Sequence, residues 1–133
     1  MSNKTKMDLE HIANTIEGLM YFERFLPFSY DGRELVRILL AAGAVATAQD
    51  TQHGRTALHT AAMTNDVELV KIILDDGVDV NIRNVQNTIP LHVALARGSK
   101  SCVGMLLSAG ANCNLQDDEG NNAFHIALLI QQK

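Results

Sequence analysis

A fixed interval of 33 residues runs through most of this chain. Three related tetrapeptides, Thr-Ala-Leu-His, Ile-Pro-Leu-His and Asn-Ala-Phe-His, recur at that interval and end at His59, His92 and His125. A period of this length is typical of stacked copies of one small unit, each of which buries its apolar side against its neighbours. The period therefore predicts a repeat architecture, which favours binding over catalysis.

Alignment on the histidines divides most of the chain into two complete and two partial units. The complete units are residues 51–83 and 84–116, and the partial units are residues 32–50 and 117–133. The length of the chain fits a single domain, and we assign that domain to residues 32–133. Residues 1–31 lack the tetrapeptide and form a separate region.

The glycines that end the second helix of each unit keep nearly the same interval. Gly77 and Gly110 lie 33 residues apart, whereas Gly43 and Gly77 lie 34 apart. Segment 48–53 has the polar composition of a loop. We therefore place the extra residue in this loop, where it leaves the helices in register.

Each unit is predicted to contain two helices followed by a hairpin-like loop. Thr56 has a side-chain oxygen that can cap the first helix, and Pro90 suits a first helical turn, where a missing N–H costs nothing. Asn65 and Gly98 occupy equivalent positions and tolerate the left-handed conformation that ends a helix. The unit therefore has recognisable start and stop signals.

Three residues depart from this pattern. Ile89 and Asn122 stand where the first complete unit has Thr56, and we expect weaker helix caps in the later units. Gly104 falls inside a predicted helix, where glycine costs about 0.5–1 kcal/mol relative to alanine.

The stretch 32–127 resembles ankyrin repeats, because several positions of that motif recur in phase. The positions that carry the resemblance are Thr56, Leu58, His59, Gly77, Pro90, Leu91, His92, Gly98, Gly110, Gly120 and His125. The resemblance implies an all-α solenoid of helix-turn-helix units joined by hairpin-like loops. It also implies a protein-binding function.

Several runs are also similar to the ankyrin array of a multidomain plant E3 ubiquitin ligase. Matching runs begin at Gly32, Asn81, Ile89 and Leu115. This resemblance implies a role in recruiting proteins for ubiquitination. It transfers no catalytic residue, since the RING and kinase parts of such a ligase have no counterpart here. We therefore predict that the chain itself is not an enzyme.

The overall charge excludes one class of partner. The chain carries 15 acidic against 11 basic residues, whereas binding to a phosphate backbone requires clustered Lys and Arg. We predict a protein partner, no nucleic acid and no direct membrane insertion. With two cysteines and no signal peptide, we expect an intracellular, cytoplasmic protein. A nuclear or endomembrane-peripheral location of a longer relative is the alternative.

The repeated histidines raise the question of a metal site. Stacked helices lie about 8–10 Å apart, whereas nitrogen ligands sit about 2 Å from a zinc ion. His59, His92 and His125 therefore cannot share one ion if each marks a successive layer. We expect them to bind backbone groups in adjoining turns, and we predict neither metal nor cofactor.

A binding surface is predicted along one side of the stack. Loop tips and first helices share that side in ankyrin-type units, and their variable residues select the partner. The positions are Gln52, His53, Arg55, Met63, Val85, Gln86, Ala96, Arg97, Asp118, Glu119 and Asn121. Any one of them read alone is an ordinary solvated residue.

Residues 1–31 have two interpretations. An apolar face over residues 7–26 predicts a helix that caps the stack on Leu35, Ile38 and Leu39. The alternative is an unrelated extension whose aromatic residues contact a partner or a membrane surface.

The last unit has bulky residues over 126–130, where small and polar ones are expected. An end unit normally needs a polar outer face. We expect marginal stability, or self-association through this layer. Besides a ligase-related scaffold, two interpretations stay open: a free-standing small inhibitor or adaptor, and a truncated product without independent function.

Overall fold

The computed structural model describes residues 32–131. The predicted capping helix within residues 1–31 lies outside this range. Six helices form the described part, which contains no strand. They are α2 (Gly32–Ala41), α3 (Ala57–Met63), α4 (Val67–Asp75), α5 (Pro90–Arg97), α6 (Lys100–Ser108) and α7 (Ala123–Gln131).

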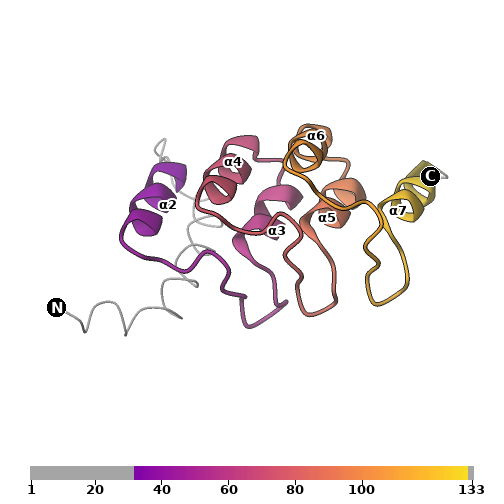
Figure 1. The fold of residues 1–133 in the computed structure, drawn as a ribbon, viewed down its shortest axis with the longest axis horizontal. Helices are drawn as coiled ribbons and strands as arrows, with labels where there is room; N and C mark the ends of the chain where they lie inside the picture. The colour runs from indigo at the N-terminus through magenta and orange to yellow at the C-terminus, as the bar shows by residue number, and fades with distance from the viewer. Residues whose placement is uncertain (1–31, 132–133) are drawn as a thin grey trace, which may run out of the picture.

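The helices form two parallel rows (Figure 1). Helices α3, α5 and α7 make the inner row, and α2, α4 and α6 make the outer row. Within each row neighbours pack on one another, and α3 and α5 also pack on the outer helix that follows them. Long connections project from the inner row, all on one side of the stack. The predicted all-α solenoid is therefore confirmed.

Short turns join the two helices of each unit as the sequence predicts. Asn65 (φ 56°) and Gly98 (φ 72°) both adopt the left-handed conformation. Asp66, which follows Asn65, accepts a hydrogen bond from the backbone N–H of Leu69 at 3.1 Å and so caps α4. A left-handed residue reverses the chain within one turn, which places α4 directly against α3.

The helix caps agree with the sequence-based expectation at Thr56 and Ile89 and contradict it at Asn122. The hydroxyl of Thr56 accepts from the N–H of His59 at 3.4 Å, and Ile89 makes no side-chain cap. The expectation of a weak cap at Asn122 is wrong. Its side-chain oxygen accepts from the N–H of His125 at 3.0 Å, because a short amide reaches the first-turn donors as well as a hydroxyl does.

The core is a series of thin layers between the rows. Leu58 and Leu91 on the inner helices and Val70, Ile73 and Leu106 on the outer ones are fully buried. Small residues complete each layer, as Ala61 and Ala94 are also fully buried. These layers hold the inner helices and their connections in one fixed repeat geometry.

Candidate protein-interaction surface

Each long connection ends in a tight hairpin built on one side chain. Asp50, Asn84 and Asp117 stand at the base of successive hairpins. In each, the side-chain Oδ1 accepts two backbone N–H groups across the turn. The distances are 2.7 and 3.3 Å for Asp50, 2.8 and 2.9 Å for Asn84, and 2.9 and 3.0 Å for Asp117.

These three acceptors were not singled out in the sequence, although a signal existed. An Asp or Asn recurs there with nearly the period of the histidines. Such short polar side chains stabilise turns by replacing a backbone acceptor. The hairpins are therefore fixed from within.

The extra residue of the first connection lies at the hairpin tip. The N–H of Asp50 donates to the carbonyl of Arg55 at 2.9 Å, five positions on. The matching bond runs only four positions from Asn84 to Thr88, at 3.1 Å, and from Asp117 to Asn121, at 3.0 Å. The insertion stays within the predicted segment, and the helices stay in register.

The first hairpin exposes Gln52 and His53 but not all of Arg55. Arg55 pairs with Asp50 at 3.4 Å, and the Asp50 side chain is only 6% exposed. The Arg55 guanidinium also lies 3.2 Å from the His53 ring and 3.7 Å from the sulfur of Met63. Arg55 thus joins the hairpin tip to the half-buried Met63 of α3.

The second hairpin presents Val85 and Gln86 to solvent. The Val85 side chain is 63% exposed, yet it covers Gly54 of the first hairpin so closely that an added Cβ there would collide with it. Gly54 also has a φ of 64°, which favours glycine. The two neighbouring hairpins are therefore in contact.

The third hairpin is tied to the second by hydrogen bonds. The N–H of Asp118 donates to the carbonyl of Gln86 at 3.2 Å, and the side-chain amide of Asn87 donates to Asp118 Oδ1 at 2.7 Å. Arg83 donates to the carbonyls of Asn87 at 2.8 Å and Gln116 at 3.0 Å. Asp118 and Glu119 are exposed beside Asn121, so this tip carries negative charge.

The inner helices continue this surface. Ala96 and Arg97 are exposed at the end of α5, in register with the half-buried Met63 of α3. One period further on, Leu129 and Ile130 of α7 are exposed as well. These two positions were not chosen from the sequence, although the 33-residue interval identifies them.

His59 links the inner row to the next hairpin. Its Nε2 lies 2.7 Å from the carbonyl oxygen of Thr88. Because a carbonyl only accepts, Nε2 carries the proton. The other ring nitrogen, Nδ1, accepts from the hydroxyl of Thr56 at 2.8 Å. The ring is therefore neutral, and burial lowers its pKa below the ordinary 6.5 despite the Thr88 carbonyl, which raises it.

His92 repeats this arrangement one unit later. Its Nδ1 accepts from the N–H of Ile89 at 3.3 Å, and its Nε2 donates to the carbonyl of Leu115 at 3.0 Å. Burial again lowers the pKa of the ring, against the opposing effects of the Leu115 carbonyl and Asp117. The expected role of His59 and His92, binding the adjoining turns, is confirmed.

His125 makes only the hydrogen bond within its own unit. Its Nδ1 accepts from the N–H of Asn122 at 3.1 Å, but its ring is exposed. No connection within residues 32–131 offers an acceptor to its Nε2. The repeated histidine is therefore a bridge between units at two positions only.

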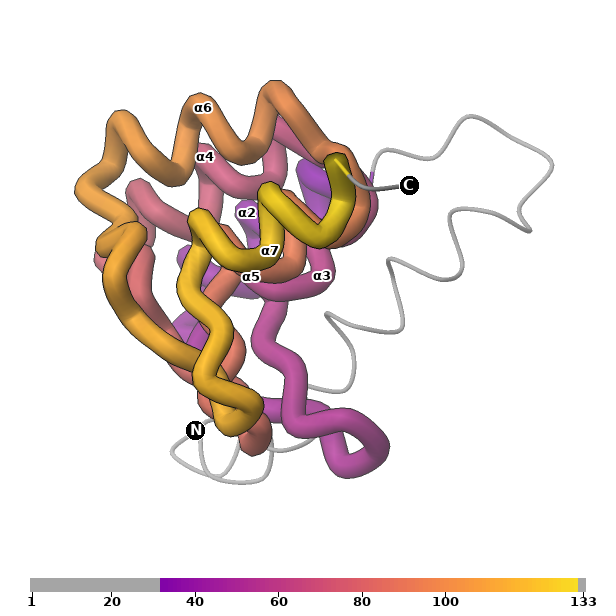
Figure 2. The backbone as a smooth tube through the Cα atoms, turned by 90° about the vertical axis from the view of Figure 1, so that its right-hand side faces the viewer, coloured from indigo at the N-terminus to yellow at the C-terminus, as the bar shows by residue number. Residues whose placement is uncertain are grey.

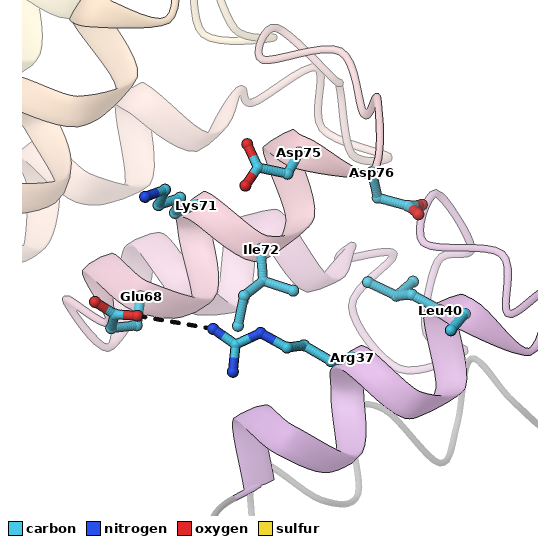
Figure 3. A pocket seen from close by; sticks show the side chains of 8 residues that line it. Arg37, Leu40, Glu68, Lys71, Ile72, Asp75 and Asp76 are labelled. Atoms are coloured by element: carbon cyan, nitrogen blue, oxygen red, sulfur yellow. Dashed lines mark ion pairs between the residues drawn. The ribbon is translucent and has the colours of Figure 1, made fainter.

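The opposite side of the stack has a shallow charged groove between α2 and α4 (Figure 3). Leu40 and Ile72 form its floor, and Arg37 pairs with Glu68 across it at 4.0 Å. Both partners of this pair are exposed, so the ion pair contributes little to stability. The groove is part of the solvated outer face of the stack, away from the hairpin tips.

Within residues 32–131, no group of three His, Cys, Asp or Glu side chains is placed to hold a metal ion. No helix in the same range has the length and apolar character needed to cross a membrane.

Comparison with known families gives one extended match. The model described as ankyrin repeats (3 copies) matches residues 28–117. This span covers two thirds of the chain and includes both complete units.

Curated relatives match stretches of about three quarters of the chain. E3 ubiquitin-protein ligase KEG of Arabidopsis thaliana is 75% identical over 97 residues, which are 73% of this chain and 6% of that protein. Protein PhlB of Serratia liquefaciens is 36% identical over 99 residues, 74% of this chain and 43% of its own length. The nuclear factor NF-kappa-B p105 subunit of Gallus gallus is 37% identical over 106 residues, 75% of this chain and 11% of its length. The chain thus spans less than half of each relative.

Proposed function

The chain belongs to the ankyrin repeat family, and from this premise we propose that it binds a protein partner along its hairpin tips and inner helices. The observation that carries the proposal is a set of exposed side chains on hairpin tips that hold one another in place, together with two at the end of α5. The set consists of Gln52, His53, Val85, Gln86, Ala96, Arg97, Asp118 and Glu119.

Rigidity of the hairpins supports this role. Each hairpin is closed by a side-chain acceptor, and the contacts of Val85 with Gly54 and of Asn87 with Asp118 join neighbours. A surface ordered before binding loses less conformational entropy when a partner docks. The exposed tips can therefore provide selectivity while the buried rows stay unchanged.

We further propose that the bound protein is a target or regulator of a ubiquitin ligase. Support comes from the 75% identity with the corresponding stretch of an Arabidopsis thaliana E3 ubiquitin-protein ligase. We expect the matched stretch of that ligase and this chain to select related partners.

An affinity capture tests the binding surface. The purified chain is immobilised and exposed to an Arabidopsis extract, and bound proteins are quantified by mass spectrometry. A variant combining His53→Ala, Gln86→Ala and Glu119→Ala removes exposed tip side chains without touching the hairpin acceptors. The control combines Glu68→Ala, Lys71→Ala and Asp75→Ala on the outer face of α4.

Specific partners should be depleted at least about fivefold by the tip variant and retained by the control, since interface centres dominate affinity. Equal retention by both variants would contradict the proposed surface. The ligase connection has its own readout. The matching 97 residues of the Arabidopsis relative should compete for the captured proteins, and absence of competition would refute that part alone.

A further inference from the structure

Two buried histidines lie on either side of one peptide group, where the second hairpin joins α5. The Nε2–H of His59 donates to the carbonyl of Thr88 at 2.7 Å. The N–H of Ile89, which belongs to the same peptide group, donates to Nδ1 of His92 at 3.3 Å. The rings stand on α3 and α5, which lie one behind the other along the inner row (Figure 2). A single peptide group therefore joins the two rings.

The bonds at the two outer ends extend this link into a chain. Thr56 donates to Nδ1 of His59 through its hydroxyl at 2.8 Å and through its backbone N–H at 3.4 Å. The Nε2–H of His92 donates to the carbonyl of Leu115 at 3.0 Å, two residues before the third hairpin begins. Every donor points the same way, from Thr56 toward Leu115, and hydrogen bonds aligned in this way polarise and strengthen one another.

The chain requires both rings to be neutral. Each ring has its proton on Nε2, so a second proton must enter at Nδ1. There it would face the backbone N–H of Thr56 or of Ile89, and a backbone donor cannot turn to become an acceptor. His59 and His92 are 0% and 2% exposed, so water does not reach the new proton. A ring that gains a proton must therefore leave its site, and its Nε2 then leaves the carbonyl that it holds.

The charged groups around the rings do little to favour the second proton. Burial is the main reason that the pKa of each ring lies below 6.5. Arg55 and His92 also lower the pKa of His59, and Arg83 lowers that of His92. Asp117 opposes these effects at His92, but its Oδ1 already accepts two N–H groups of its own hairpin. On the helices packed against the inner row, the other charged or titratable side chains line the outer groove or are exposed: Glu68, Lys71 and Asp75 of α4, Lys100 of α6 and His125 of α7.

We propose that proton uptake by either histidine interrupts the chain and loosens the second and third hairpins together, while the outer helices stay folded. The peptide group of Thr88 and Ile89 transmits the effect, because it is bonded to both rings. Apolar side chains such as Leu58 and Ile73 hold the two rows together, and these do not titrate. That acid would release a bound partner rests on the proposed function, whereas the loosening itself does not.

Amide hydrogen exchange of the full chain, followed by NMR between pH 7.5 and pH 5.5, tests the proposal. The amides of Thr56 and Ile89 report on the chain, because they donate to the rings, and the amide of Ile73 in α4 reports on global unfolding. An opening that returns one ring to its ordinary pKa of 6.5 becomes about tenfold more favourable over this range. Because coupled rings open together, the opening equilibrium at both reporting amides should rise about a hundredfold.

Variants of the two rings separate coupled from independent opening. His59→Gln and His92→Gln each remove one ring that can gain a proton, and either variant should reduce the rise to about tenfold at both amides. Gln86→Ala, on an exposed tip, is the control and should leave the rise unchanged. Circular dichroism verifies that the variants stay folded, and the size of the rise in the unmodified chain tests the coupling without any substitution.

Two results would overturn the proposal. A rise of only about tenfold at each amide, with each variant affecting only its own amide, would show that the rings open independently. Equal protection of the Thr56, Ile89 and Ile73 amides at every pH would show that the proton acts on the whole fold. Neither result would affect the proposed binding of a protein partner, which the affinity capture tests separately.

Discussion

At the scale of single residues, the three repeated histidines form a natural series. His59, His92 and His125 each accept a backbone N–H three positions earlier. Only His59 and His92 also donate to the next connection. Replacing each in turn therefore separates the local hydrogen bond from the one that joins two units.

We predict that His59→Ala lowers the free energy of unfolding by about 2–4 kcal/mol, because it empties a buried site and leaves the Thr88 carbonyl without its donor. His125→Ala should cost less than about 1 kcal/mol, since the ring is exposed. Urea unfolding followed by circular dichroism measures both. Similar losses for the two variants would contradict a bridging role.

A pH dependence follows from the same rings. Burial lowers the pKa of His59 and of His92 below 6.5, so the unfolded chain binds protons more readily than the folded one. Stability should therefore be full above the unfolded pKa and fall as the pH drops through 6.5 toward the folded values. Thermal melts between about pH 7.5 and pH 5.5 test this direction.

The variant His59→Gln should flatten that profile, because glutamine keeps hydrogen-bonding groups but has no proton to gain. Gln86→Ala, on an exposed tip, is the control and should leave the slope unchanged, since it removes no titratable group. A profile that stays as steep without His59 would assign the pH dependence to other groups.

At the scale of elements, the sequence predicts helices better than hairpins. Helix ends follow from single residues with strong conformational preferences, such as Asn65 and Gly98, and these predictions are confirmed. The hairpins depend on which backbone groups an Asp or Asn side chain reaches, and composition does not reveal that. The partial burial of Arg55 was not predicted for the same reason, since its pairing with Asp50 exists only in the folded turn.

Two glycines of one unit should respond oppositely to alanine. Gly104 lies inside α6, and an added Cβ there meets nothing within 4 Å, so Gly104→Ala should stabilise the chain by about 0.5–1 kcal/mol. Gly98 has a φ of 72°, and Gly98→Ala should destabilise it by about 1 kcal/mol because of backbone strain. Thermal denaturation of both variants under identical conditions measures these changes in stability. A change of the same sign in both variants would contradict the prediction.

At the scale of the whole molecule, side chains of one unit accept hydrogen bonds from the backbone of the next. Asn65 accepts from the N–H of Cys102 at 3.3 Å, and Asn81 accepts from the N–H of Asn112 at 2.8 Å. The 33-residue period predicted the stacking itself. It could not predict these bonds, because they join individual side chains that do not recur in every unit.

The two cysteines report on opening of the stack. Cys102 is fully buried, and burial, with a smaller contribution from Asp66, raises the pKa of its thiol. Cys113 is exposed. We predict that a thiol reagent labels Cys113 at once and Cys102 at least about a thousandfold more slowly, since Cys102 must wait for unfolding of a marginally stable domain.

Mass spectrometry of the labelled peptides distinguishes the two sites, and Cys113→Ser leaves Cys102 as the sole reporter. Denaturant should speed the labelling of Cys102 with the dependence of global unfolding. Rapid labelling of both thiols in the folded chain would show that the central layer opens by itself.

The extra residue in the first hairpin shows how hairpin length can change, both in evolution and by engineering. The insertion lengthens the turn between Asp50 and Arg55, and the paired rows of helices absorb none of it. Tip length is thus an independent variable, uncoupled from the repeat that determines foldability. Loops of other lengths could be grafted between residues 50 and 55, giving a library of recognition sites on a frame that does not need to be redesigned.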